Sequence, residues 1–518
     1  MAVKKEEKNL GAGVADGFLK ISIGEGKGID LRVPVTGLQN GEAVTVDGNV
    51  QGYTAEDGGN HAGAGEKDKV VAELTRRHYK ITEVKRGPET KIDGTVLYIR
   101  DGIEKEAYET EELVHELTID FITPDKYDSY SDSIMDVQPV ATKEGDSPLG
   151  QGVTRVLDGV VMMLTGRDEA GKQIGEFGSS EGTLDEHIMF GRPGSPDRGD
   201  ILIRVHAVIQ EGTGMERRGP MSVHRATDVI TQEIRMALKK LEPEQAIETE
   251  TFKHVRRYGR KKVVIVKEIM GQGAMHDNYL LPEEPVGVLG ARPNVDIGNV
   301  PIMTEPLEVL DGCIHALTCI GPSTKETSRH YWREPLVLAT MEDEELDLCG
   351  VIFVGSPQVN AEKFYVSGRV GAMVAALDVD GAFVGTEGEG NNHIDYSSHI
   401  EQIGKRGIPV VGLTFSAKTG ALVVGNKYMD HMIELAKCED GLDNRILENN
   451  TITPMDAERA IAMLKNAMAG EPVKSPERHW TPEVRMSNLE IVEDVTGKKI
   501  NREPNETSLP VRDKEETK

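Results

Sequence analysis

The sequence has 518 residues, which is too many for one hydrophobic core of ordinary size and predicts two or three domains. Its 56 glycines and only 4% aromatic residues favour cores of Val, Ile, Leu, Ala and Met, as in α/β proteins. The 87 acidic residues outnumber the 60 basic ones, and the net charge of −27 would repel nucleic-acid phosphates and anionic lipids, so we expect neither as a partner.

The first part of the chain predicts short β-strands. Residues 1–68 alternate apolar runs (FLKISIG, IDLRVPV, EAVTVDG) with glycine and end in a polar, glycine-rich stretch, which indicates a β-rich lead-in followed by a flexible linker. Residues 78–102 contain two strand-like runs around a turn-rich centre, which predict a β-hairpin or a meander.

The middle of the chain predicts a sheet and a covering helix. The runs GVVMMLTG and DILIRVHAVI are typical of strands, and apolar residues recur at helical spacing from Ala226 to Leu241 before Pro243 closes the helix. The run KKVVIVKEIM predicts a buried strand with a glycine-rich loop at its carboxyl end, where α/β proteins place ligands. This loop carries Gln272, His276, Asp277 and Tyr279.

The last part alternates apolar strands with helices. The strand-like runs are GVIFVG, GAFVG, IPVVGLTF and ALVVG, and helices are expected over 360–377, near 396–405 and up to about 437. Thr453 predicts the N-cap of a final helix with Pro454 in its first turn, and Gly470 predicts its end. We therefore expect an α/β fold: a β-rich N-terminal part followed by a C-terminal doubly wound, mostly parallel sheet domain.

The expected domain boundaries follow from these patterns. They are a lead-in and linker over 1–68, an α+β region over 69–318, an α/β domain over 319–470 and a charged tail over 471–518. The start of the chain has no apolar run after its lysines, and no stretch of 18 apolar residues occurs, so a cytoplasmic location is expected.

The common cofactor and metal motifs are missing from the sequence. GAGVADG has the wrong glycine spacing for a dinucleotide loop, no Walker-type loop occurs, and no H-E-x-x-H motif indicates a metal, so no metal site is expected. The loop GTEGEGNNHIDYSSH, which includes Glu387, follows a predicted strand. It is either a substrate-binding loop or a solvated acidic turn.

The segment DGCIHALTCIGPSTKETSRHYWREP contains two of the four cysteines. A cysteine thiolate can attack the carbonyl of the preceding residue, here Thr318, and convert the amide to a thioester. Elimination and hydrolysis would then leave a pyruvoyl group in place of Cys319. The alternative is that Cys319 is a buried structural cysteine, which is the commoner role of an unpaired thiol.

Together with HYKITEVKRGPETKIDGTVLYIR, GQGAMHDNYLLPEEPVG and GVIFVG…GAFVGTEGEGNN…GIPVVGLTF, this segment resembles the glycine/sarcosine/betaine and D-proline reductase family. The resemblance covers roughly residues 78–470, and the Thr-Cys junction with ETSRHYWREP favours its proline-reductase branch. It implies a precursor that cleaves itself between Thr318 and Cys319, so that a covalent pyruvoyl cofactor forms from Cys319. Cys313 would be a bystander.

The resemblance also implies the reaction and the partners. The pyruvoyl carbonyl would bind the amine of an amino acid for reductive C–N bond cleavage, by implication D-proline to 5-aminovalerate. A separate small selenocysteine-containing subunit would take part, the cleaved fragments would stay associated, and a higher oligomer is expected. The open alternatives are a subunit of the glycine/sarcosine/betaine component B type and an unprocessed accessory homologue.

Other polar residues of these segments are candidates for substrate binding or proton transfer. Arg329 and Arg333 suit a substrate carboxylate, and histidines and carboxylates suit proton movement. An ion-pair network at a surface or between subunits is the alternative for each. The full set of candidates is His276, Asp277, His315, Glu326, Arg329, His330, Arg333 and Glu387.

Overall fold

The computed structural model describes part of the chain, in two compact units, Met1–Ala64 and Gly65–Lys518. The described residues are 11–15, 18–23, 29–34, 68–174, 180–214, 218–269, 279–280, 284–287, 295–296, 300–316, 326–357, 359–386, 392–415, 424–435, 446–473, 493, 497 and 499. None of the helices among them has both the length and the apolar character needed to cross a bilayer.

The first unit contains a three-stranded antiparallel sheet in the order β1-β2-β3. Its strands are β1 (Gly11–Ala15), β2 (Phe18–Ile23) and β3 (Ile29–Pro34). The predicted strands FLKISI and IDLRVP are confirmed as β2 and β3. The predicted strand EAVTVDG lies outside the described residues.

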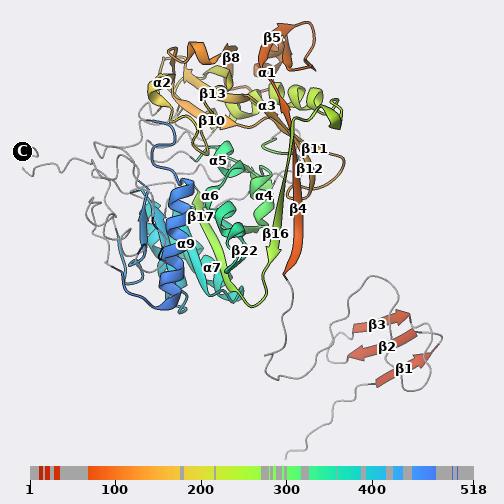
Figure 1. Cartoon of the computed structure of the whole chain (residues 1–518), viewed down its shortest axis with the longest axis vertical. Coiled ribbons are helices and arrows are strands. Elements are labelled where there is room, and N and C mark those ends of the chain that lie inside the picture. Colours follow the sequence, from red (N-terminus) through yellow and green to blue (C-terminus); the bar gives the residue numbers. More distant parts are fainter. Residues whose placement is uncertain are drawn as a thin grey trace, which may run out of the picture. The chain divides into compact units, whose positions relative to one another are not determined.

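The second unit begins with two four-stranded sheets (Figure 1). One has the order β11-β12-β4-β16, and the other has the order β10-β13-β15-β8. The strands of the first are β4 (Lys69–Lys80), β11 (Ala141–Glu144), β12 (Gly152–Asp158) and β16 (Glu248–Arg256). Those of the second are β8 (Val114–Ile122), β10 (Ile134–Gln138), β13 (Val160–Asp168) and β15 (Ile201–Ile209).

The runs GVVMMLTG and DILIRVHAVI are confirmed as β13 and β15, which pair in parallel. The segment predicted as a hairpin or meander forms a true hairpin only between β6 (Lys91–Asp93) and β7 (Val96–Arg100). The strand β5 (Glu83–Gly87) pairs with β7 in parallel, and β4 belongs to another sheet, so the meander interpretation is wrong.

Helix α3 (Arg218–Leu238) starts before the predicted Ala226 and buries apolar side chains such as Val223, Ile230 and Ile234 against strands of the β10-β13-β15-β8 sheet. Their three- and four-residue spacing keeps them on one helix face. Short elements complete this region. They are α1 (Ile103–Glu109), η1 (Pro124–Lys126), β9 (Tyr130–Ser131), β14 (Gly182–Thr183), α2 (Leu184–His187) and η2 (Pro243–Gln245).

A six-stranded sheet in the order β20-β22-β17-β23-β24-β25 forms the other half of the second unit. Five strands run parallel, and β20 is an antiparallel edge strand. The strands are β17 (Lys261–Ile269), β20 (Ile302–Thr304), β22 (Leu346–Gly355), β23 (Gly381–Thr386), β24 (Val410–Thr414) and β25 (Met432–Glu434). The fold is therefore mixed α/β with several sheets, one of them rich in parallel pairs. The doubly wound arrangement stays a prediction.

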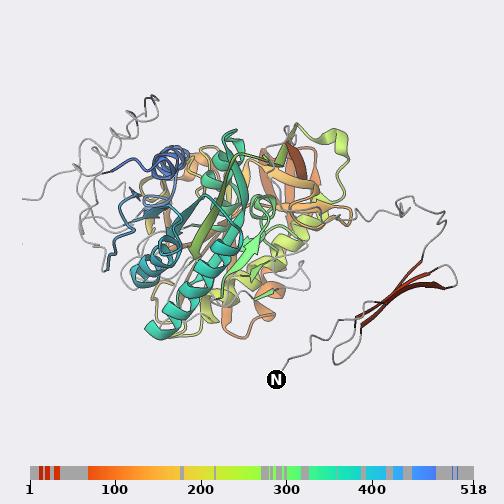
Figure 2. The same ribbon diagram turned by 90° about the horizontal axis from the view of Figure 1, so that it is seen from below.

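Helices pack on both faces of this sheet, which explains the continuous apolar runs of its strands (Figure 2). Along β17, Val264 and Val266 face α7 (Asn360–Ala376) and α8 (Asn392–Gly404). Val263 and Ile265 belong to the opposite core, which includes side chains of α6 (Pro335–Glu342) and α9 (Pro454–Ala469). Successive side chains of a strand alternate between its two faces, so one strand serves both cores.

The helix ends test the capping predictions. Helix α9 has Thr453 as its N-cap and Gly470 at its end with φ 75°, as predicted. Helix α8 begins at Asn392, before the expected 396. The helix expected up to about 437 is wrong within 424–435, where turns lead into β25. Asn426 Oδ1 accepts a hydrogen bond from the Tyr428 N–H (2.9 Å), a turn that competes with a helix.

The remaining described elements are β18 (Tyr279–Leu280), β19 (Val295–Asp296), α4 (Pro306–Leu310), β21 (Ile314–His315) and α5 (Ser328–Trp332). Strand β18 pairs with both β19 and β21. The six-stranded sheet takes β17 and β20 from before residue 318 and its other four strands from after it. The predicted domain boundaries stay a prediction.

Candidate active site

Half of the predicted site residues fall where the structure describes the chain. Thr318, Cys319, His276, Asp277 and Glu387 lie outside the described residues. The described ones are His315, Glu326, Arg329, His330 and Arg333. All five follow or precede the segment 317–325 closely in sequence, and the structure shows what each contacts.

The two described ends of the segment 317–325 are joined by Ser328, the first residue of α5. The Ala316 N–H donates to Ser328 Oγ (3.0 Å), and the Ser328 hydroxyl donates in turn to Asp136 Oδ2 (2.7 Å). The Ser328 N–H donates to Asp136 Oδ1 (2.8 Å). Asp136, on β10, is fully buried, and burial raises the pKa of its carboxyl to about 7, although these hydrogen bonds oppose the rise. The Asp136 carboxyl thus holds Ser328 directly and Ala316 through Ser328.

Two buried histidines lie beside this anchor. His224 Nδ1, from α3, is 2.5 Å from His315 Nε2, from β21, and 3.8 Å from Asp136 Oδ2. Burial lowers the pKa of His315 to about 4 and the pKa of His224 well below its usual value, so both rings are neutral at physiological pH. His315 Nδ1 lies 3.4 Å from the Val286 carbonyl oxygen, to which it can donate, so its Nε2 accepts from His224.

This tautomer assignment leaves His224 Nε2 unprotonated. Among the described residues, that nitrogen has no hydrogen-bond partner. Both nitrogens of His315 are occupied, whereas His224 retains a free lone pair. His224 therefore suits proton acceptance better than the predicted His315. The sequence does not indicate this role, because His224 lies 91 positions before His315.

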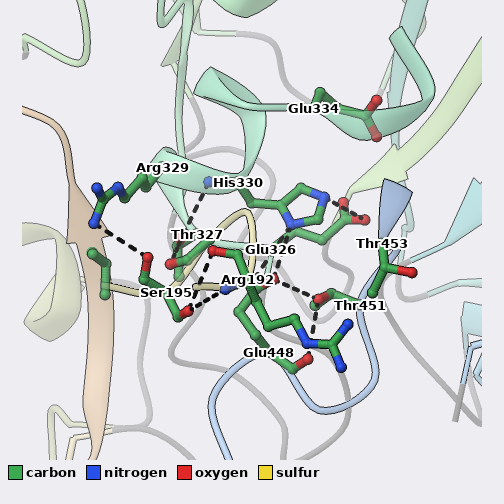
Figure 3. A network of polar contacts seen from close by, with 12 residues as sticks. Arg192, Ser195, Glu326, Thr327, Arg329, His330, Glu334, Glu448, Thr451 and Thr453 are labelled. Carbon is green, nitrogen blue, oxygen red and sulfur yellow. Dashed lines mark hydrogen bonds and ion pairs between the residues drawn. The ribbon is translucent and has the colours of Figure 1, made fainter. Parts of the chain in front are cut away.

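A second polar network surrounds His330 in α5 (Figure 3). His330 Nδ1 lies 3.3 Å from Glu448 Oε1, and its Nε2 lies 3.7 Å from Glu326 Oε1. Burial disfavours a charged ring, but Glu448 and Glu326 outweigh it and raise the pKa of His330. Lys267, from β17, lies 2.9 Å from both Glu326 and Glu334. Burial disfavours the charged form of Lys267 too, but the two carboxylates outweigh burial and raise its pKa. The network therefore favours the protonated forms of Lys267 and His330.

Arg329 and Arg333, the predicted carboxylate ligands, are both paired with aspartates. Arg329 donates to Asp200 (2.8 Å) and Asp197 (3.0 Å), and Arg333 donates to both oxygens of Asp197 (3.0 and 2.8 Å). These are the ion pairs of the alternative interpretation, and a role in substrate binding stays a prediction. The two arginines line a cavity of about 640 Å³ together with Arg76, His78, Asp158 and Trp332.

Comparison with known proteins supports the resemblance seen in the motifs. The chain is 57% identical to the D-proline reductase proprotein PrdA of Acetoanaerobium sticklandii over 508 residues, 97% of this chain and 81% of that protein. It is 22% identical over 361 residues to the glycine reductase complex component B subunits alpha and beta of the same organism, covering 66% of this chain and 79% of that protein. The sarcosine reductase complex component B subunit alpha of Peptoclostridium acidaminophilum is 28% identical over 181 residues, covering 34% and 40% of the two chains.

The similarity to the first relative reaches beyond residues 78–470, the range expected from motifs alone, because it covers nearly the whole chain. No solved structure matches the chain. A sequence model of the glycine/sarcosine/betaine reductase component B subunits matches residues 72–421, more than half of the chain. The chain therefore belongs to the family of glycine/sarcosine/betaine reductase component B subunits, which confirms the prediction of an oxidoreductase related to amino-acid reductases.

Proposed function

We propose that the chain is the precursor of a D-proline reductase, a cytoplasmic enzyme that reduces D-proline to 5-aminovalerate. The observation that carries the proposal is the 57% identity to a D-proline reductase proprotein over 97% of this chain. Similarity to the glycine reductase subunits is much lower, at 22%, and so favours the proline branch over a component B of the glycine type.

The proposal includes cleavage between Thr318 and Cys319 with formation of the pyruvoyl group from Cys319. In the sequence, Thr318 follows Ala316 by two residues, and Ala316 is held by the Ser328–Asp136 anchor described above. Cys313, by contrast, is fully buried, and burial raises the pKa of its thiol well above the usual value, which suits a structural cysteine.

We assign His224 as the base that accepts the thiol proton in this step. A neutral imidazole with a free lone pair is suited to it, and the His224–His315 contact fixes the ring so that Nε2 carries that lone pair. Asp136 stays a positioning residue, because its two oxygens accept hydrogen bonds from Ser328 and other donors.

In the mature enzyme the pyruvoyl carbonyl supplies the electrophile that binds the substrate amine. The residues of the His330 network would then handle protons. His330 is protonated more readily than a free histidine because Glu448 and Glu326 flank it, so it can supply a proton to the nitrogen released from carbon. A selenocysteine-containing subunit would supply the attacking atom, since no described pair of cysteines forms a redox couple.

The sheet supports the expectation that the cleaved fragments stay together. Strand β17 precedes the junction, yet it pairs with β22 on one side and β23 on the other, and both follow the junction. Fully buried residues of β17 take part in the cores on both faces. Separating the fragments would break two parallel ladders and expose both cores, at a cost of many kcal/mol.

Intact mass spectrometry of the purified chain, with and without a hydrazine that traps carbonyls, tests the proposal. We expect two fragments that meet at Thr318/Cys319, with only the fragment that starts at position 319 gaining the hydrazine mass. Cys319→Ala should remain one chain, and Cys313→Ala is the matched control that should cleave normally. A wild-type chain that stays intact and unlabelled, even when it is co-expressed with the selenoprotein subunit, would refute it and favour an unprocessed accessory homologue.

A further inference from the structure

A separate group of buried ionisable side chains lies on the other face of the six-stranded sheet. Glu268 follows Lys267 in β17 and therefore points to the opposite face. Asp395 and His399, four residues apart in α8, share one face of that helix. One ligand atom from each of Glu268, Asp395 and His399 lies within 4.8 Å of those of the other two.

Each carboxylate in this group has one anchored oxygen and one open oxygen. Thr386 donates to Glu268 Oε1 (3.2 Å), and Lys363, from α7, donates to Asp395 Oδ1 (2.7 Å). Among the described residues, Glu268 Oε2, Asp395 Oδ2 and both nitrogens of His399 have no hydrogen bond of normal geometry. His399 Nε2 lies 3.4 Å from Glu268 Oε2. In known metal sites, hydrogen bonds of this kind to one oxygen of a carboxylate orient its other oxygen toward the metal.

The Asp136–His224–His315 group also combines carboxylate and histidine side chains, but its ligand atoms are mostly occupied by hydrogen bonds. Asp136 accepts hydrogen bonds from Ser328, Val137 and Gln138, and His224 and His315 bond to each other. Its carboxylate has no open oxygen. Of these two groups of described residues, the Glu268 group is the one with three open ligand atoms within 4.8 Å of one another, and every member of it is fully buried.

The charges of the Glu268 group also leave a place for a cation. Two carboxylates face one ammonium, that of Lys363, which is itself fully buried. Because the three side chains and Lys363 are fully buried, solvent screens these charges little, and a bound cation would offset the second carboxylate.

We propose that Glu268, Asp395 and His399 bind a divalent transition-metal ion, with Zn²⁺ as the probe of choice. One imidazole and two carboxylates suit zinc and related ions, whereas Mg²⁺ and Ca²⁺ prefer oxygen alone. A tetrahedral ion with bonds of about 2.0–2.1 Å separates its ligand atoms by about 3.3–3.4 Å, close to the His399–Glu268 contact. Three protein ligands leave a fourth position, which hydroxide or a carboxylate would fill while balancing the added charge.

The site has a further consequence that rests on the proposed cleavage. Glu268 lies before the junction, and Asp395 and His399 lie after it. The ion would therefore tie the two fragments together. Spacing in the sequence offers no sign of the site, since Glu268 lies in β17 and Asp395 lies far along the chain in α8.

The test measures metal content of the full chain rather than activity. Protein that has been stripped of metal with a chelator is dialysed against Zn²⁺, and the bound metal is measured by inductively coupled plasma mass spectrometry. We expect one equivalent for wild type, and an affinity at least roughly tenfold weaker for His399→Gln and Asp395→Asn. His254→Gln is the matched control, since His254 is also buried but contacts Leu348 O (2.8 Å) and Glu305, and it should retain one equivalent.

Two outcomes would overturn the proposal: a wild type that binds no metal, or variants that bind it as tightly as wild type. If His399→Gln fails to fold, titration of wild type with Co²⁺ replaces it, and the absence of a saturable, chelator-reversible visible band overturns the proposal. Cys319→Ala, which cannot be cleaved, should bind the same amount. Its metal content separates a failure of this inference from a failure of the proposed cleavage.

Discussion

Ser328 offers the sharpest test of how the junction is positioned. Ser328→Ala removes two hydrogen bonds, from the Ala316 N–H to Oγ (3.0 Å) and from the hydroxyl to Asp136 (2.7 Å), and leaves the Ala316 N–H unpaired in a buried site. A neutral hydrogen bond contributes about 1 kcal/mol and one to a charged group about 1.5–3 kcal/mol, so the loss is about 2.5–4 kcal/mol. If the transition state for cleavage loses all of it, cleavage slows about 70- to 900-fold.

The assay follows the disappearance of freshly translated precursor by intact mass over time. The same change in the Cys319→Ala background reports the loss of folding stability separately, by denaturant unfolding. Ser367→Ala is the matched control, because this buried serine lies in α7 and its hydroxyl contacts Lys363 O (2.8 Å) and Asp395 O (3.5 Å), away from Ser328 and Asp136 in the sequence. A Ser328→Ala precursor that cleaves at the wild-type rate while losing stability would show that the anchor does not position the junction.

Three further predictions concern other charged groups. The pKa of Asp136 is about 7 in the folded protein, above its unfolded value, so its contribution to stability is present below about pH 4 and is lost as pH rises to about 7. Asp136→Asn should lack this pH dependence, so the difference in unfolding free energy between wild type and variant, measured with denaturant, should shrink from about pH 4 to about pH 7. Glu448→Gln should lower the pKa of His330 and move the alkaline limb of the pH–rate profile to lower pH, and an unmoved limb would exclude His330 as the acid. Arg333→Gln should cost less than about 1 kcal/mol of stability and leave KM nearly unchanged if Arg333 serves only its ion pair with the partly exposed Asp197. A large rise in KM would instead support its predicted role as a substrate ligand.

Local patterns in the sequence were sufficient for most elements of the fold. The Thr453 cap, the Gly470 terminus and the apolar run of β17 each depend on interactions within a few residues, and the structure has them where they were expected. The expected helix before 437 failed for an equally local reason, the turn at Asn426. Such elements can be predicted from the sequence because the interactions that form them involve residues close together in the chain.

The candidate site was only partly predictable. His330 and Glu326 stood out because they lie next to the Thr-Cys junction in sequence. Asp136, by contrast, meets Ser328 across 192 positions, and nothing in the spacing of either residue indicates the other. Contacts of this kind follow from the pairing of strands, so the sequence identified residues near the junction but not the groups that surround it.

The central place of β17 has a consequence for biosynthesis. A chain starting at residue 319 would lack the strand that fills the sheet between β22 and β23, and two unpaired strand edges would be open to aggregation. In the uncut precursor the missing strand is supplied in cis, at the high effective concentration of a tethered segment. If the chain is cleaved as proposed, folding should therefore precede cleavage. The two fragments made from separate genes should assemble poorly, whereas fragments cut from a folded precursor should stay together.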